Sequence, residues 1–283
     1  MNEFKSSPLT RQEFDLFRGY IESESGISLD DEKAYLLENR LKFLLNKYES
    51  HSFGDLFQKV KAGKHPLLKI EVIDAITTNE TLWFRDSGPY KILQDVFLPK
   101  MVEEVAKGKP RIRIWSAACS TGQEPYSIAI TINEFCNHSN QDILKPSHIE
   151  ILATDISKNA IETSRLGAYD KLSVSRGMPD ELLSRYFKQN QNLWIIDPNL
   201  KKNIEFREFN LKNDFSPLGT FDIIFCRNVA IYFSSDFKKN LFHKLRMALR
   251  PGGFFFLGSS ETLSYYSNEF NLKEHNKYNY YTV

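Results

Sequence analysis

A chain of 283 residues with a formal net charge of +1 is long enough for one or two domains with a substantial core. Its near-neutral charge argues against nucleic acid or an anionic membrane surface as a partner, and no apolar run has the roughly 20 residues of a membrane span. Residues 1–5 lack the apolar stretch of a signal peptide. Three cysteines without C-x-x-C spacing fit a reducing compartment, and the six histidines are scattered. We therefore expect a cytoplasmic monomer without membrane insertion and without a metal site.

Residues 1–76 predict a small all-helical domain. Apolar side chains recur at helical spacing in three stripes, which begin at Phe14, Leu37 and Phe53. Ser52 precedes the third stripe and is a suitable N-cap. The stripes indicate core packing. A slight excess of acidic over basic residues gives no indication of a basic docking surface.

Residues 77–90 follow as a linker, but their composition is not that of a flexible one. The stretch 77–85 contains two aromatic residues, an arginine and three threonines. This composition predicts a structured hinge that lies over the edge of a sheet.

Residues 91–283 alternate apolar runs with helical patterns, which predicts an α/β domain with a mostly parallel sheet covered by helices. The apolar runs lie at 112–115, 149–153, 221–226 and 254–257, and the helical patterns at 124–136, 158–165 and 236–249. The last residues, 278–283, are β-prone and could add an antiparallel strand. Between about 170 and 207 the rhythm breaks into a short helix and two strand-like segments, 193–196 and 204–207. We expect an inserted antiparallel β flap there.

The segment 114–130 runs from a strand through small residues into a helix. In an α/β fold, such a loop brings backbone N–H groups close to a ligand. It has a single glycine, Gly122, and no G-x-G-x-x-G pattern. Glu124 at the start of the helix would repel a pyrophosphate and would suit a cationic or hydroxyl-bearing ligand. The alternative is an ordinary strand-to-helix turn.

Two further strand ends carry polar residues. Asp155 follows the run 149–153, where a carboxylate can accept both ribose hydroxyls of an adenosine ligand; the alternative is a helix N-cap. Asn210 could hydrogen-bond an adenine amine while Leu211 packs against the ring, or the pair could form a plain turn.

The fourth strand end places a phenol at the sheet edge. The buried run 221–226 ends in Arg227-Asn228, and Tyr232 follows four residues after the asparagine. The alternative is a buried tyrosine with a satisfied hydroxyl. Taken together, the four strand ends fit S-adenosylmethionine better than NAD, because they contain no pyrophosphate cradle and because Glu124 suits a cationic methionyl group.

Four motifs resemble the chemotaxis receptor methyltransferases of the CheR family, and the resemblance spans nearly the whole chain. The motifs are Thr78-Asn79-x-Thr81-x-x-Phe84-Arg85, Trp115-Ser116-Ala117-Ala118-x-Ser120-Thr121-Gly122-x-Glu124-Pro125-Tyr126-Ser127, Cys226-Arg227-Asn228-Val229-x-Ile231-Tyr232-Phe233 and Gly258-x-Ser260-Glu261.

The resemblance implies a class I, Rossmann-like methyltransferase fold with a helical N-terminal domain and a β flap. It implies methyl transfer from S-adenosylmethionine, which leaves S-adenosylhomocysteine, to glutamate side chains of methyl-accepting chemoreceptors. In the family, the N-terminal helices face the receptor's methylation region and the flap can bind a peptide at the receptor's C-terminus. The cofactor contacts that we expect are Asn79, Thr81, Arg85, Ala117, Glu124, Asp155, Asn210, Leu211, Asn228 and Val229.

Arg85 and Tyr232 are the candidate catalytic residues. A glutamate has a pKa of about 4.3 and is already ionised at neutral pH, so the reaction needs positioning and desolvation rather than a general base. Arg85 would hold the substrate carboxylate by charge-assisted hydrogen bonds and Tyr232 by its phenol.

The sequence is compatible with two other functions. One is a methyltransferase of the same fold that acts on another protein or on nucleic acid, which the near-neutral charge disfavours. The other is a silent module that binds S-adenosylmethionine as a sensor or scaffold. A silent module would have little reason to keep Arg85, Glu124, Asp155 and Tyr232 together.

Overall fold

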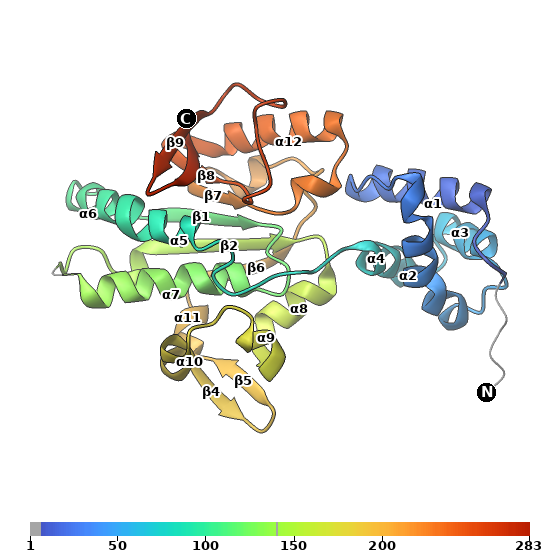
Figure 1. Ribbon diagram of the computed structural model, residues 1–283, viewed down its shortest axis with the longest axis horizontal. Coiled ribbons are helices and arrows are strands. Elements are labelled where there is room, and N and C mark those ends of the chain that lie inside the picture. The colour runs from blue at the N-terminus through green and yellow to red at the C-terminus, as the bar shows by residue number, and fades with distance from the viewer. Residues whose placement is uncertain (1–6, 140) are drawn as a thin grey trace.

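The computed structural model describes residues 7–139 and 141–283 (Figure 1). Met1–Lys5, where we expected no signal peptide, lie outside the described residues. A helical domain lies at one end of the molecule, next to an α/β domain with a central sheet, and a small β subdomain projects from the latter. All three cysteines are free thiols. Among the described residues, no helix combines the length and the apolar character that a membrane crossing requires.

The helical domain packs around the three predicted stripes. Phe14, Leu37 and Phe53 are each at most 1% exposed and belong to one apolar cluster. The predicted cap is confirmed, because the Ser52 hydroxyl accepts a hydrogen bond from the Asp55 N–H at 3.1 Å. The elements are α1 (Arg11–Ser25), the 3₁₀ turn η1 (Asp31–Lys33), α2 (Ala34–Lys47), α3 (Phe53–Ala62) and α4 (Pro66–Ile76).

The central sheet has seven strands in the order β6-β2-β1-β7-β8-β10-β9. The first five are parallel, whereas β10 pairs antiparallel with β8 and with β9. The strands are β1 (Ile112–Ala117), β2 (Ile149–Asp155), β6 (Ile204–Glu208), β7 (Phe221–Cys226), β8 (Leu249–Phe256), β9 (Asn271–His275) and β10 (Tyr278–Thr282). The mostly parallel sheet and the antiparallel strand at 278–283 are as expected.

Helices cover both faces of this sheet, which explains the nearly continuous apolar runs in its parallel strands. One face packs against α5 to α8 and the other against α12 (Figure 1). The elements are α5 (Gly88–Ile92), the π-helical turn η2 (Leu93–Phe97), α6 (Leu98–Ala106), α7 (Gln123–His138), η3 (Pro146–His148), α8 (Lys158–Leu166), η4 (Ser216–Leu218), η5 (Ala230–Tyr232) and α12 (Ser235–Ala248).

The β flap is a three-stranded antiparallel sheet in the order β3-β5-β4. Its elements are β3 (Ala168–Asp170), α9 (Lys171–Ser175), α10 (Asp180–Tyr186), β4 (Phe187–Asn190), β5 (Leu193–Ile196) and α11 (Pro198–Lys201). The expected C-terminal end of the flap needs correction, because Ile204–Glu208 pairs in parallel with β2 in the main sheet. Its short apolar pattern resembles that of a flap strand, and only long-range pairing distinguishes the two.

Candidate functional site

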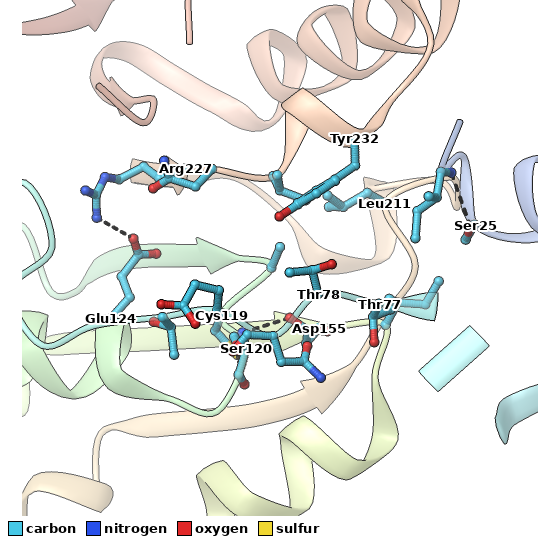
Figure 2. Close-up of a pocket in the computed structure, with 18 of the residues that line it drawn as sticks. Ser25, Thr77, Thr78, Cys119, Ser120, Glu124, Asp155, Leu211, Arg227 and Tyr232 are labelled. Carbon is cyan, nitrogen blue, oxygen red and sulfur yellow. Dashed lines mark hydrogen bonds and ion pairs between the residues drawn. The ribbon is translucent and has the colours of Figure 1, made fainter. Parts of the chain in front are cut away.

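A pocket lies at the carboxyl ends of β1, β2 and β7, beside the helical domain (Figure 2). This is the edge at which open α/β sheets bind ligands. Ala117 is the exception among the expected cofactor contacts: it is fully buried in the core, and its neighbour Ala118 lines the pocket instead. The expected site residues that do line it are Asn79, Thr81, Arg85, Glu124, Asp155, Asn210, Leu211, Asn228, Val229 and Tyr232.

The loop after β1 is folded so that it contacts both the end of β2 and the linker. The Ser120 N–H donates to Asp155 Oδ2 at 2.8 Å, and the Ser120 hydroxyl donates to the Asn79 carbonyl at 3.0 Å. Gly122 has φ +97, and a Cβ there would lie 3.0 Å from the Cβ of Ser164. Glycine is therefore required for the close contact of this loop with α8.

Asp155 is a buried carboxylate with unused acceptor capacity. It is 6% exposed, and the N–H of Ser157 donates to its Oδ1 at 2.9 Å. Burial raises its pKa, while hydrogen bonds from backbone N–H groups oppose that rise. The N-cap of α8 is Ser157, whose hydroxyl accepts from the Ala160 N–H. Because a carboxylate has about four lone-pair sites, Asp155 can accept further hydrogen bonds from a ligand.

Glu124 forms an ion pair with Arg227, which the sequence pattern did not predict. Arg227 Nη1 donates to Glu124 Oε2 at 2.8 Å (Figure 2). The Ser116 hydroxyl donates to Oε1 at 2.7 Å. Arg227 also binds Asp86 Oδ2 at 2.8 Å. Two carboxylates around one guanidinium leave one negative charge in this cluster. The preference for a cationic ligand end that we inferred from Glu124 therefore rests on the whole cluster.

Arg227 also holds the linker that carries Arg85. Its Nη2 donates to the carbonyl oxygen of Arg85 at 2.6 Å. The Arg227 side chain is 2% exposed. Burial lowers its pKa, but the electrostatic effect of Tyr90, Glu124 and Asp86 outweighs burial, so that the pKa is raised overall. The position of Arg227 directly after the apolar run of β7 indicates that it lies at the ligand-facing edge of the sheet, but not that it contacts the linker.

Arg85 and Tyr232 approach the pocket from different segments. Among the described residues, the Arg85 guanidinium makes one hydrogen bond within the protein, to the Glu80 carbonyl at 3.2 Å. Figure 2 shows the Tyr232 side chain pointing into the pocket, between the Arg227–Glu124 pair and Leu211. The phenol and the arginine therefore line one cavity, although the chain separates them by more than a hundred residues.

The turn that carries Tyr232 is held by Glu261, from the fourth motif. Its carboxylate accepts from the N–H groups of Asn228 at 2.6 Å, Gly258 at 2.8 Å and Ile231 at 3.3 Å. Asn228 has φ +56, a left-handed conformation that asparagine tolerates better than most residues. These bonds fix the position at which the turn leaves β7.

The loop after β6 is held by residues from two elements. The Asn210 side chain donates to the Glu24 carbonyl at 2.6 Å and accepts from the Lys212 N–H at 2.9 Å, so both ends of its amide are engaged within the protein. Lys244 in α12 donates to the carbonyls of Leu211 at 2.6 Å and Asn213 at 2.9 Å. Burial lowers the pKa of Lys244 to about 8.

We expect Lys244→Met to weaken the binding of S-adenosylhomocysteine about three- to tenfold, because the loop that carries Asn210 and Leu211 is no longer held and the net loss corresponds to one hydrogen bond of roughly 0.5–1.5 kcal/mol. In the wild type, affinity should fall as the pH rises through about 8, because Lys244 then loses a proton and a donor. Titration calorimetry from pH 7 to 9 measures both effects. Lys238→Met, on the same helix but over Tyr266, is the matched control and should bind normally. Equal affinity of the two variants would contradict the assignment.

The helical domain and the linker complete the pocket wall. The contribution of the linker was expected from the sequence, whereas that of the helical domain was not. Ser25, Ile27 and Ile76 line the pocket from this side. Arg40 in α2 donates to the carbonyls of Ile76 and Thr77 and so fixes the start of the linker. No local pattern in the sequence indicates which helix ends meet the sheet edge.

The pocket contains groups suited to each part of S-adenosylmethionine. A cluster with one net negative charge suits the methionyl end, a buried carboxylate suits ribose hydroxyls, and Leu211 and Ile27 offer apolar surface for a base. No group of three or more histidine, cysteine, aspartate or glutamate residues in 7–139 and 141–283 could hold a metal ion. The sheet and this pocket define the class: the protein has the fold of the S-adenosylmethionine-dependent methyltransferases.

Comparison with known proteins gives the family. Residues 79–279 match the model of the CheR methyltransferase S-adenosylmethionine-binding domain, and residues 12–77 match that of the CheR all-alpha domain. The chain belongs to the CheR methyltransferase family.

Named relatives align over nearly their whole length. Chemotaxis protein methyltransferase Cher2 of Pseudomonas putida is 43% identical, over 89% of this chain and 90% of the relative. Chemotaxis protein methyltransferase 1 of Pseudomonas aeruginosa is 41% identical, over 93% and 92%. Chemotaxis protein methyltransferase of Borreliella burgdorferi is 33% identical, over 90% and 89%.

Proposed function

We propose that this protein transfers the methyl group of S-adenosylmethionine to glutamate side chains in the cytoplasmic helices of chemoreceptors, which gives glutamyl methyl esters. The observation that carries the proposal is the meeting of Arg85 and Tyr232 with Glu124 and Asp155 in one pocket. Its support includes the relatives named as chemotaxis protein methyltransferases. The reaction would serve sensory adaptation.

Each part of the pocket has a distinct role in binding the methyl donor. Asp155 would accept the ribose hydroxyls, and the Glu124–Arg227–Asp86 cluster would face the cationic methionyl end. Leu211 would pack against the adenine. The Asn210 NH2 group donates to Glu24 and its Oδ1, the atom that an adenine amine would need, accepts from the Lys212 N–H. Adenine would therefore be recognised by the backbone of this loop rather than by the Asn210 amide. Asn79, Thr81, Asn228 and Val229 would complete the wall.

The main requirement of the methyl transfer is that the protein positions the two reactants. S-adenosylmethionine supplies an electrophilic methyl group on a sulfonium. A glutamate, with a pKa of about 4.3, arrives ionised, so the protein has no proton to remove. Arg85 and Tyr232 hold the carboxylate at the pocket and exclude water from it. Positioning of this kind lowers a barrier by roughly 7–11 kcal/mol.

The decisive experiment incubates the protein with methyl-labelled S-adenosylmethionine and purified cytoplasmic fragments of chemoreceptors. Base-labile label on a receptor glutamate, located by mass spectrometry, is the expected result. Binding of S-adenosylhomocysteine without transfer to any receptor would contradict the proposal and favour a sensor or scaffold.

We expect Arg85→Ala and Tyr232→Phe each to lower kcat about tenfold or more, since each removes a hydrogen bond to the substrate carboxylate that contributes roughly 1.5 kcal/mol. Affinity for S-adenosylhomocysteine should change much less, and calorimetry measures it beside labelling rates. If either variant kept a normal kcat, that residue would have no positioning role. If affinity fell as far as kcat, the residue would belong to the cofactor site instead.

The finer partner assignments are part of the proposal. The helical domain would face the methylation region of the receptor, and the flap would bind a peptide at the receptor's C-terminus. We propose that the protein acts in the cytoplasm as a monomer. Gel filtration at micromolar concentration tests the last point.

A further inference from the structure

The segment that follows α1 leaves the helical domain and enters the methyltransferase site. Ser25 and Ile27 line the pocket, and Figure 2 shows Ser25 beyond Leu211, on the opposite side from the Arg227–Glu124 pair. The helical domain therefore contributes residues to the pocket itself.

This segment binds the backbone of the turn that carries Tyr232. The Ser28 N–H donates to the Tyr232 carbonyl oxygen at 2.8 Å. Ile27 forms an isolated antiparallel β bridge with Phe233, the next residue. Glu261 holds the beginning of the turn through the N–H of Asn228, and the helical domain holds its end.

Gly26 allows the segment to lie this close. It has φ +78, and a Cβ at this position would lie 2.4 Å from Cε1 of Phe237 in α12. The end of α1 is held from the other side, where Asn210 donates to the Glu24 carbonyl and Lys212 donates to the Glu22 carbonyl. Cationic and amide donors commonly satisfy the last carbonyls of a helix. The segment is thus fixed between two parts of the α/β domain.

We propose that Gly26–Ser28 of the helical domain positions Tyr232 for methyl transfer. Gly26 is the contact with α12, and Ser28 and Ile27 are the contacts with the turn. The inference rests on the proposed role of Tyr232 and adds that residues outside the α/β domain set the location of its phenol. A displacement of this segment also moves Ile27 in the pocket wall and the Glu24 carbonyl that Asn210 binds. It should still affect catalysis more than cofactor binding, because Asp155 and Glu124 are held by other contacts.

The test uses Gly26→Ala, whose methyl group would push the segment away from Phe237. Gly63→Ala is the matched control: Gly63 also ends a helix of the helical domain, at φ +66, but nothing lies within 4 Å of a Cβ there. The readouts are kcat with a chemoreceptor cytoplasmic fragment that the wild type labels, and the affinity for S-adenosylhomocysteine. We expect Gly26→Ala to lower kcat tenfold or more and affinity less than threefold, and Gly63→Ala to leave both near wild type.

The rescue variant Gly26→Ala/Phe237→Ala removes the whole ring that the new methyl group would meet, and it should recover most of the kcat of Phe237→Ala alone. If Gly26→Ala does not fold by itself, the comparison of the double variant with the single Phe237 variant provides the test. Normal kcat in Gly26→Ala, equal losses of kcat and affinity, or no recovery in the double variant would each overturn the inference. A wild type that labels no receptor would overturn the proposed function and this inference together. If the wild type labels a receptor but the variants do not show the expected changes in kcat and affinity, only this inference is overturned.

Discussion

Arg227→Met is expected to lower the free energy of unfolding by about 3–5 kcal/mol, because it leaves the buried Glu124 carboxylate without its cation and also removes the partner of the more exposed Asp86. The Arg227 side chain is 2% exposed and that of Glu124 is 12% exposed, so water compensates little for the loss. Methionine keeps much of the volume, which separates the effect of charge from that of a cavity. Urea unfolding followed by circular dichroism measures the change.

Two comparisons isolate the charge effect in Arg227→Met. Arg207→Met removes an exposed arginine that pairs with Glu205, and it should cost at most about 1 kcal/mol. The double variant Glu124→Gln/Arg227→Met should recover part of the stability, because it removes one of the two uncompensated charges. If Arg227→Met cost no more than Arg207→Met, charge compensation would not be the role of Arg227.

Asp155→Ala is expected to weaken the binding of S-adenosylhomocysteine by about a hundredfold, or roughly 2.7 kcal/mol. The substitution removes the acceptor for the ribose hydroxyls and leaves the N–H groups of Ser120 and Ser157 without a partner. Those bonds shape the loop after β1, so both direct binding and the arrangement of the pocket are affected. Titration calorimetry at pH 7 measures the change.

Glu208→Ala is the matched control for Asp155. Glu208 is the register partner of Asp155 on β6 and carries an exposed carboxylate outside the pocket lining. It should bind S-adenosylhomocysteine normally. An unchanged affinity in Asp155→Ala would remove Asp155 from the cofactor site.

The same carboxylate gives binding a pH dependence. Burial raises the pKa of Asp155 above that of an ordinary aspartate, so the accepting form is lost at a higher pH than usual as the solution is acidified. Affinity in the wild type should therefore fall on the acidic side, and Asp155→Ala should lack this dependence.

Much of the α/β domain could be predicted because its signals are local. A run of apolar residues followed by small or polar ones marks a buried parallel strand and its ligand-facing end, as at Ile112–Ala117 and Ile149–Asp155. Of the two carboxylates that indicate the cofactor class, Asp155 is the last residue of such a strand, and Glu124 begins the helix that follows the loop after the other strand. Strand Ile204–Glu208 was misplaced in the flap because a short apolar segment does not specify its partner.

The sequence by itself determined the helical domain, the parallel sheet and the family motifs, since spacing along the chain encodes each of them. Only the tertiary structure decided which charged groups pair with each other and which side chains and N–H groups bind the backbone carbonyls around the site. Arg227 neutralises Glu124, Lys244 holds the loop after β6, and Ser28 binds the carbonyl of Tyr232. These pairs join segments far apart in the chain, and nothing in the local pattern of either partner indicates the other. A hydrogen bond or an ion pair depends on a distance in space, which only the packing of the two domains sets.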